Sequence, residues 1–290
     1  MTIADALAFA SAKLTAAGIE TPRFDAQLLL AWTLKARREK LAREPERVLT
    51  EREAIIFAKA VSLRTERRPL PYITGEAWFY GRAFKINRAV LIPRPETELL
   101  VERALAAIQI IEAPQIADIG TGSGCVAVTL ACERPDAAVW ATDLSADALK
   151  EARKNVVRYH LQDHVSLLQG DLLQPLPSDL RLDILVSNPP YVTEAELPGL
   201  QPEVRDYEPR LALSGLGDAA GPDGTALHRR LFTEAPAFLK PGGRVLLEVG
   251  ASQAQSVAEM ARALGYTGVE VTADYAQIGR VVSACYGKSA

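Results

Sequence analysis

A run of four residues, Asn188-Pro189-Pro190-Tyr191, brings hydrogen-bond acceptors and an aromatic ring together at the end of an apolar segment, residues 182–187. That segment is typical of a buried strand, and it cannot continue through the prolines, because proline has no amide donor and fixes its own φ. The chain must turn out of the sheet with the Asn188 oxygen, the Pro189 carbonyl and the Tyr191 ring held together. Such a group suits a planar ligand that carries an NH2. Alternatively, the loop merely ends the strand and Tyr191 is a core residue; the tetrapeptide alone leaves both interpretations open.

A glycine-rich turn lies upstream, between an apolar segment that predicts a strand (residues 115–119) and one that predicts a buried helix (residues 125–132). The turn is Gly120-Thr121-Gly122-Ser123-Gly124. A strand, a glycine loop and a helix form the nucleotide-binding turn of doubly wound sheets, where the missing Cβ atoms let a ligand approach the backbone. The spacing is G-x-G-x-G rather than the G-x-G-x-x-G of dinucleotide folds. Alone the loop is weak evidence, because such turns also begin ordinary helices.

Further polar residues follow neighbouring predicted strands. Asp143 directly follows the predicted strand at 138–142, and the predicted strand at 165–168 leads into Asp171-Leu172. With Asp118 and Asn188, these acids lie along the carboxyl edge of one sheet, where open α/β sheets bind their ligands. An acid about twenty residues beyond the glycines can accept both hydroxyls of a ribose. Asp143 could instead cap the helix that starts near Ser145, and the two roles are compatible.

Composition sets broad limits on the protein. With 290 residues, 48% of them hydrophobic and 24% charged, the chain is typical of a soluble protein of one to two domains. No apolar run approaches the roughly 20 residues that span a bilayer, and the N-terminus lacks a basic signal region, so we expect no membrane association. The net charge of −3 argues against stable nucleic-acid binding.

The cysteines and histidines predict neither disulfides nor a metal site. An odd, scattered set of thiols suggests a reduced, cytoplasmic protein, and the histidines have no ligand spacing with Cys or paired acids. Cys125 lies at a predicted helix start, where a thiolate could be stabilised, but we interpret it as a small residue packed beside the glycine loop. The residues concerned are Cys125, Cys132, Cys285, His160, His164 and His228.

The N-terminal part is predicted to be helical. One apolar face repeats from Ile3 until Gly18; Thr21 is the expected N-cap of a second helix, and Thr50 that of a third. Residues 1–75 hold 13 Lys and Arg against 9 Asp and Glu, which indicates either a solvated surface or a mildly basic protein-docking face.

The later chain is predicted to continue as a hairpin at 79–92, a helix at 96–111 and a loop at 194–225 that contacts substrate. After a strand at 244–249, the pair 269–272 and 280–285 would close the sheet with one antiparallel strand.

Together these features resemble the class I S-adenosylmethionine-dependent methyltransferases, in which Asn-Pro-Pro-Tyr marks enzymes that methylate a nitrogen on a planar system. Residues 71–81 and 90–98 further resemble the segment joining the two domains of the HemK/PrmC family, the protein-(glutamine-N5) methyltransferases of class I peptide chain release factors. The similarity continues through 204–209 and 240–243. A sister family that methylates a ribosomal protein shares the tetrapeptide but usually departs from the Ile92-Pro93-Arg94-Pro95-Glu96-Thr97-Glu98 run.

The resemblance implies an α/β fold with a Rossmann-like seven-stranded mixed sheet and a small N-terminal helical domain. It implies a substrate-docking domain at 1–75, a linking β-hairpin at 76–95 and a catalytic domain at 96–290. The cofactor would be S-adenosylmethionine, leaving S-adenosylhomocysteine, with no metal, and the partner a class I release factor whose Gly-Gly-Gln glutamine is methylated, modulating translation termination.

The resemblance also assigns residues. Gly120, Thr121, Gly122, Ser123 and Gly124 would bind the methionine part of the cofactor, Asp143 the ribose, and Asp171 with Leu172 the adenine. Asn188 would contact both cofactor and substrate; it and Pro189 would accept the hydrogens of the glutamine amide, Pro190 would stiffen the turn, and Tyr191 would pack on the amide face.

Other interpretations stay open. An amino methyltransferase acting on a ribosomal protein glutamine or on a nucleic-acid base shares the tetrapeptide, although a nucleic-acid enzyme should show a basic face or an added recognition module. A dehydrogenase shares the glycine loop and its acid but leaves Asn188 unexplained. A non-catalytic binding module leaves the polar edge of the sheet unexplained.

Overall fold

The chain folds into two compact units in the computed structural model, which describes residues 1–217 and 219–287. The first unit is Met1–Glu76 together with a later segment, Gln201–Tyr207. The second is Ala77–Leu200 together with the chain from Glu208 onward. The segment Gln201–Tyr207 falls within the loop that the sequence predicts at 194–225, so that loop is divided between the units.

The first unit is helical around its own apolar core. Its helices are α1 (Ile3–Ala16), α2 (Pro22–Thr33), α3 (Arg38–Arg43), α4 (Glu51–Thr65), α5 (Leu70–Thr74) and the short α9 (Pro202–Arg205). The core includes Leu14, Leu29, Leu30 and Phe57. Thr50 caps α4 as predicted, in a capping box in which its hydroxyl accepts from the Glu53 N–H and the Glu53 carboxylate accepts from the Thr50 N–H.

The expected cap at Thr21 is correct in position but different in its hydrogen bond. The Thr21 hydroxyl donates to the Asp25 carboxylate at 2.8 Å and makes no bond to the backbone of α2. Asp25 is buried and also accepts from Arg64 Nε at 2.7 Å. A buried carboxylate needs several donors, so Thr21 serves Asp25 rather than the helix end.

A two-stranded hairpin precedes the main sheet. It pairs β1 (Glu76–Phe79) with β2 (Arg82–Lys85), so it is shorter and earlier than the hairpin predicted at 79–92. Tyr80 and Gly81 both have positive φ, +50° and +70°, as a tight two-residue hairpin turn requires. The pairing of this hairpin is not continued beyond β2, because the chain turns where the Asn87 side chain accepts from the Ala89 N–H.

The second unit contains a seven-stranded mixed sheet of order β5-β4-β3-β6-β7-β9-β8, which confirms the predicted fold class. All its strands are parallel except β9, which runs antiparallel to β7 and β8. The strands are β3 (Gln115–Ile119), β4 (Ala138–Asp143), β5 (Val165–Gln169), β6 (Leu182–Ser187), β7 (Leu239–Glu248), β8 (Thr267–Ala273) and β9 (Gly279–Cys285).

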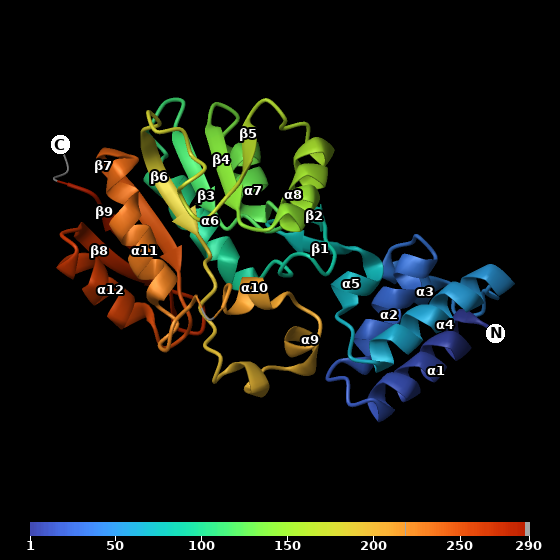
Figure 1. Cartoon of the computed structure of the whole chain (residues 1–290). Coiled ribbons are helices and arrows are strands. Elements are labelled where there is room, and N and C mark those ends of the chain that lie inside the picture. Colours follow the sequence, from blue (N-terminus) through green and yellow to red (C-terminus); the bar gives the residue numbers. More distant parts are fainter. Residues whose placement is uncertain (218, 288–290) are drawn as a thin grey trace. The chain divides into compact units, whose positions relative to one another are not determined.

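Helices pack against this sheet, with α8 beside β5 and α12 beside β8 (Figure 1). The main helices are α6 (Pro95–Ala107), α7 (Cys125–Glu133), α8 (Ala146–Arg158), α11 (Ala226–Glu234) and α12 (Ala254–Ala263). The shorter elements are η1 (Leu197–Gly199), α10 (Arg210–Leu213) and η2 (Ala235–Ala237). Helix α6 stops four residues before the predicted end at 111. Within the described ranges, no helix has the length and apolar character needed to cross a membrane.

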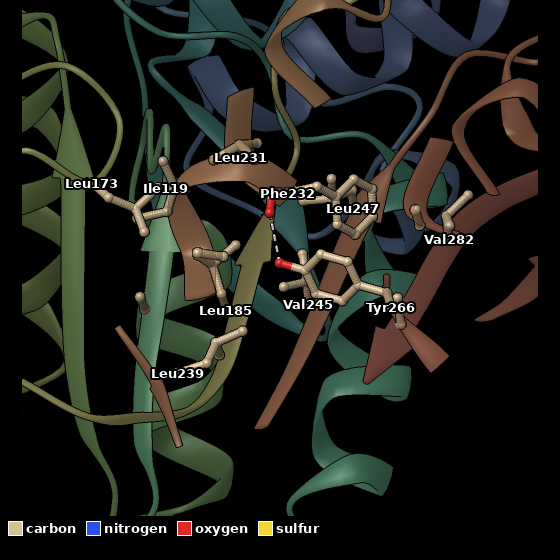
Figure 2. Packing of buried hydrophobic residues seen from close by; sticks show 14 of the residues in the cluster. Ile119, Leu173, Leu185, Leu231, Phe232, Leu239, Val245, Leu247, Tyr266 and Val282 are labelled. Carbon is tan, nitrogen blue, oxygen red and sulfur yellow. Dashed lines mark hydrogen bonds between the residues drawn. The ribbon is translucent and has the colours of Figure 1, made fainter. Parts of the chain in front are cut away.

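The core beneath the carboxyl edge is formed by side chains from the strands and from α11 (Figure 2). Leu185 of β6 and Leu247 of β7 belong to the same buried cluster as Phe232, whose carbonyl accepts a hydrogen bond of 2.8 Å from the buried Tyr266 hydroxyl. The ring of Tyr266 meets that of Phe232 edge to face, with centroids 5.0 Å apart. This packing holds α11 against the strands that end at the candidate site.

Candidate functional site

The in-register pairing of the central strands brings the predicted polar residues together. Ile119, the last residue of β3, is paired with Thr142 on β4 and with Ser187 on β6. The Ser187 hydroxyl also donates to the Ile119 carbonyl at 2.6 Å. The next residue on each strand, Gly120, Asp143 and Asn188, therefore emerges at the same edge of the sheet.

A cavity of about 510 Å³ opens at this edge, and its wall belongs to the second unit. Most of the predicted residues line it: Gly120, Thr121, Gly122, Ser123, Asp143, Asp171, Leu172, Asn188 and Pro190. Three predicted residues, Gly124, Pro189 and Tyr191, are not part of the wall that the described residues form. The volume suits a small organic ligand, since ligand pockets measure about 300–1,000 Å³.

The glycines of the loop serve two different needs. Gly120 and Gly122 have φ of +76° and +56°, and a Cβ added at either would meet no atom within 4 Å. Their backbone thus faces open space that a ligand can enter. At Gly124, with φ of +79°, a Cβ would come within 3.2 Å of the Ala152 Cβ on α8. Gly124 is a packing residue between helices, which explains its absence from the cavity wall.

Asp118 joins the glycine loop to the start of α7. Its carboxylate accepts from the Thr121 hydroxyl at 2.7 Å and from the Ala127 N–H at 3.1 Å. Burial raises the pKa of this carboxyl to about 6, against the opposing effect of those two donors. Asp118 therefore fixes the shape of the loop.

Asp143 braces the loop from the neighbouring strand. Its Oδ2 accepts from the Gly122 N–H and its Oδ1 from the Ser145 N–H, both at 2.8 Å. Ser145 itself caps α8, accepting from the Ala148 N–H at 3.1 Å. Burial raises the pKa of Asp143, and its two backbone donors oppose that rise. A carboxylate has about four acceptor positions, so Asp143 can brace the loop and still accept from a ligand.

Asp171 has an ion-pair partner that the sequence analysis missed. Arg230 of α11 donates to its carboxylate at 2.8 Å and also lines the cavity. The adjacent Leu172 has φ of +47°, in the left-handed region that a branched side chain rarely adopts, and its carbonyl accepts from the Thr142 hydroxyl at 2.9 Å. Arg230 gave no local signal, because it lies 59 residues from Asp171 on an ordinary amphipathic helix.

Side-chain hydrogen bonds hold the Asn-Pro-Pro-Tyr turn at both ends. Asn188 Nδ2 donates to the hydroxyl of Thr97 on α6 at 3.1 Å. The Tyr191 carbonyl accepts from Gln253 Nε2, also at 3.1 Å. Burial raises the pKa of the Tyr191 phenol to about 12, so the ring stays neutral. The turn is therefore held in place, and its residues Asn188 and Pro190 line the cavity.

A second missed acid, Glu248, lies at the end of β7. It is 1% exposed, and its Oε2 has no hydrogen-bond partner among the described residues. Burial raises the pKa of its carboxyl to about 7, although hydrogen bonding from the Thr97 side chain lowers it somewhat. One acid closing an otherwise apolar strand was the only signal in the sequence.

A third missed acid, Glu208, fastens the segment before α6. It accepts from the Ile92 N–H at 3.1 Å and from Arg94 Nη2 at 2.6 Å. Arg94 also lines the cavity. The ion pair therefore shapes one wall of the site.

The remaining candidate groups are inert. Burial raises the pKa of the Cys125 thiol to about 12, which agrees with a packing role. Burial also lowers the pKa of His228 to about 4, and its Nε2 lies 2.8 Å from the Glu248 carbonyl oxygen. In residues 1–217 and 219–287, no three His, Cys, Asp or Glu side chains are grouped so that they could hold a metal ion.

Family models match both parts of the chain. The PrmC N-terminal domain matches residues 5–75, and the methyltransferase small domain matches residues 95–199. The release factor glutamine methyltransferase of Moorella thermoacetica is 45% identical over 277 residues, covering 95% of each chain. That of Cereibacter sphaeroides is 42% identical over 284 residues, covering 98% of each.

Solved structures share the fold at low identity. A methyltransferase from Pyrococcus furiosus has a TM-score of 0.52 and 18% identity, covering 72% of this chain and 91% of the other. The catalytic domain of hMettl16, solved with an RNA hairpin, has a TM-score of 0.55 and 16% identity, covering 86% and 87%. At these identities the likeness concerns the fold alone.

The raised pKa of Glu248 predicts a pH-dependent stability. The folded state favours the neutral acid, so this contribution is complete below the unfolded value of about 4.5 and is lost as pH rises through about 7. Glu248→Gln removes the titration. We expect the variant to gain stability relative to the parent between pH 5 and pH 8, by on the order of 2–3 kcal/mol. Urea unfolding at both pH values measures this, and an equal difference at the two would contradict it.

Proposed function

Because the chain belongs to the family of release factor glutamine methyltransferases, we propose that it transfers a methyl group from S-adenosylmethionine to the glutamine side-chain nitrogen in the Gly-Gly-Gln motif of class I peptide chain release factors, modulating translation termination. The observation that carries the proposal is Asn188. Its Nδ2 is bound to Thr97 and it lies in the wall of a cavity beside the glycine loop. An amide so held directs its oxygen toward a ligand that bears N–H groups.

The cavity has features that fit S-adenosylmethionine, which supplies an electrophilic methyl group on sulfur when bound. The backbone at Gly120 and Gly122 faces open space, as close approach of the methionine part requires. We propose that Thr121 and Ser123 complete this cradle, and that Gly124 shapes it by letting the loop turn into α7 beside Ala152. Asp143 would accept the ribose hydroxyls, and Asp171, steadied by Arg230, would bind the adenine together with Leu172. We propose that the enzyme uses no metal.

The acceptor chemistry explains why two oxygens are needed. A glutamine nitrogen is a poor nucleophile because its lone pair is delocalised into the carbonyl. In the proposed mechanism Asn188 Oδ1 and the Pro189 carbonyl accept its two hydrogens, increase the electron density on nitrogen and direct the lone pair at the methyl group. Pro190 stiffens the turn, and Tyr191 packs against the amide face. Orientation of this kind can contribute on the order of 7–11 kcal/mol, and the product loses its proton to water.

The first unit is the proposed docking domain for the release factor, with residues 76–95 as the link to the catalytic part at 96–290. Its basic excess is partly neutralised within the unit, because Arg64 and Arg67 both donate to Glu203, at 2.9 and 2.7 Å. We propose a cytoplasmic enzyme that binds neither nucleic acid stably nor membranes.

The ribose assignment predicts a matched pair of affinities. Asp143→Ala should weaken S-adenosylmethionine binding more than tenfold, since charge-assisted hydrogen bonds contribute about 1.5–3 kcal/mol each. The substitution also removes the brace on Gly122, so a 2′-deoxyribose analogue of the cofactor separates the two effects. Measured by calorimetry, the parent should bind the analogue more weakly than the cofactor. The variant should bind the analogue and the cofactor with equal affinity. An equal penalty in both proteins would contradict the ribose contact.

The acceptor assignment predicts that Asn188→Ala retains most cofactor affinity but transfers about 10²–10³ times more slowly, because one positioned hydrogen-bond acceptor is lost at the transition state. Single-turnover transfer and calorimetry measure the two properties separately. A variant that transfers at the parental rate would disprove the acceptor role.

The substrate assignment is tested with labelled S-adenosylmethionine and separately purified release factor, ribosomal proteins, RNA and DNA. We expect label in the release factor only, and none when its Gly-Gly-Gln glutamine is replaced by alanine. Free glutamine should be a far poorer acceptor, because remote contacts support orientation of the reacting amide. Label in a ribosomal protein or a nucleic-acid base, with the release factor unmodified, would overturn the assignment and leave the methyltransferase activity intact.

A further inference from the structure

Two buried polar side chains lie next to Asn188, and one of them, Thr97, also lines the cavity. The Thr97 hydroxyl accepts from Asn188 Nδ2 at 3.1 Å, and Thr97 is 3% exposed on the first turn of α6. The Glu248 carboxyl at the end of β7, 1% exposed, interacts with the same hydroxyl. A buried acid with an oxygen that lacks a partner is costly, so its place beside this hydroxyl calls for an explanation.

The hydrogen-bond capacity of a hydroxyl supplies one. A threonine hydroxyl has one proton to donate and lone pairs that accept. If its proton is committed to a carboxylate, its oxygen can only accept from the Asn188 side chain. Asn188 must then present its NH2 to Thr97 and its Oδ1 to the cavity. When Glu248 is protonated it can donate to the Thr97 oxygen. The Thr97 proton is then free to point at Asn188, and the Asn188 side-chain amide can flip.

We propose that Glu248, acting through the Thr97 hydroxyl, is a positioning group that fixes the side-chain amide of Asn188 with its oxygen toward the substrate nitrogen. The inference rests on the proposed function for the identity of that nitrogen, and on the hydrogen bond and burial for the orientation. In this arrangement Thr97, which also lines the cavity, acts on the substrate amide through Asn188, and Glu248 is not part of the wall that the described residues form.

Glu248 and Asp118 are the two nearby carboxyls whose pKa values lie close to neutral pH. Burial raises the pKa of Glu248 to about 7, Glu96 raises it further, and Arg280 and Arg94 lower it. The neighbouring Tyr191, Cys125 and His228 stay neutral at that pH, because burial puts their pKa values at about 12, 12 and 4. Asp118 of β3, whose pKa is raised by burial to about 6, also titrates nearby, but its carboxylate accepts from the Thr121 hydroxyl of the glycine loop.

The test compares hydroxyl variants in the full-length protein. Thr97→Val keeps the shape and removes the hydroxyl; we expect kcat to fall about ten- to a hundredfold, the loss expected for one hydrogen bond to an oriented group, with the affinity for S-adenosylmethionine unchanged. Thr97→Ser should restore most of the rate. The matched control is Thr129→Val on α7, another fully buried threonine, whose hydroxyl has no partner among the described residues; it should keep the parental kcat.

The pH profile separates positioning from simple support. Above a pH of about 7 the ionised carboxylate holds the Thr97 proton, so kcat of the parent should decline as pH falls through that value. Glu248→Gln should transfer more slowly and lose this inflection. Parental kcat in Thr97→Val, or the same inflection in Glu248→Gln, would overturn the proposal.

A readout without transfer keeps the proposal separate from the proposed function. The ¹⁵N-labelled side-chain amide of Asn188, identified by its loss in Asn188→Ala, should shift between pH 6 and pH 8 in the parent and not in Glu248→Gln. If the parent fails to methylate a release factor but shows this shift, the substrate assignment fails and the positioning stands. If the chemical shift of the Asn188 side-chain amide changes neither with pH nor in Glu248→Gln, the positioning role is refuted.

Discussion

Parallel pairing of β4, β3 and β6 is the constraint on which the candidate site depends. Ile119 is paired with Thr142 on one side and Ser187 on the other, and the Ser187 hydroxyl ties its strand to the Ile119 carbonyl. Moving a strand by one residue reverses the faces of its side chains, which would send its apolar residues out of the core. The same burial that fixes the register therefore fixes where Asp143 and Asn188 emerge.

That arrangement places several carboxyl groups in buried positions, away from solvent. Burial raises the pKa values of Asp118, Asp143 and Glu248, so each ionised form lowers the stability of the fold. Asp143 recovers part of this cost from the Gly122 N–H of the glycine loop, and Asp118 from the Ala127 N–H of α7. The apolar core beneath the strands supplies the rest (Figure 2). The site is thus a locally unfavourable region that a well-packed sheet can tolerate.

The sequence predicted what local patterns encode. Apolar runs located the strands, glycines located the loop, and Thr50 located the start of α4, because each signal depends on neighbours within a few residues. It could not predict partners chosen by tertiary packing. Arg230 reaches Asp171 across 59 residues, and Arg64 reaches Glu203 across 139; the latter explains why a segment inside a predicted loop groups with the helical unit.

Asparagine at position 188 creates a requirement that an acid there would not. A carboxylate would accept through either oxygen, but its charge would attract the sulfonium and it could be protonated. An amide stays neutral, yet it has one donor end and one acceptor end of nearly the same shape. Only a contact to one end of the amide can choose between them, and the Thr97 hydroxyl makes that contact here. Because a hydroxyl can donate or accept, the orientation of the Asn188 amide depends on the group that binds the Thr97 proton. This accounts for the buried acid Glu248 next to Thr97.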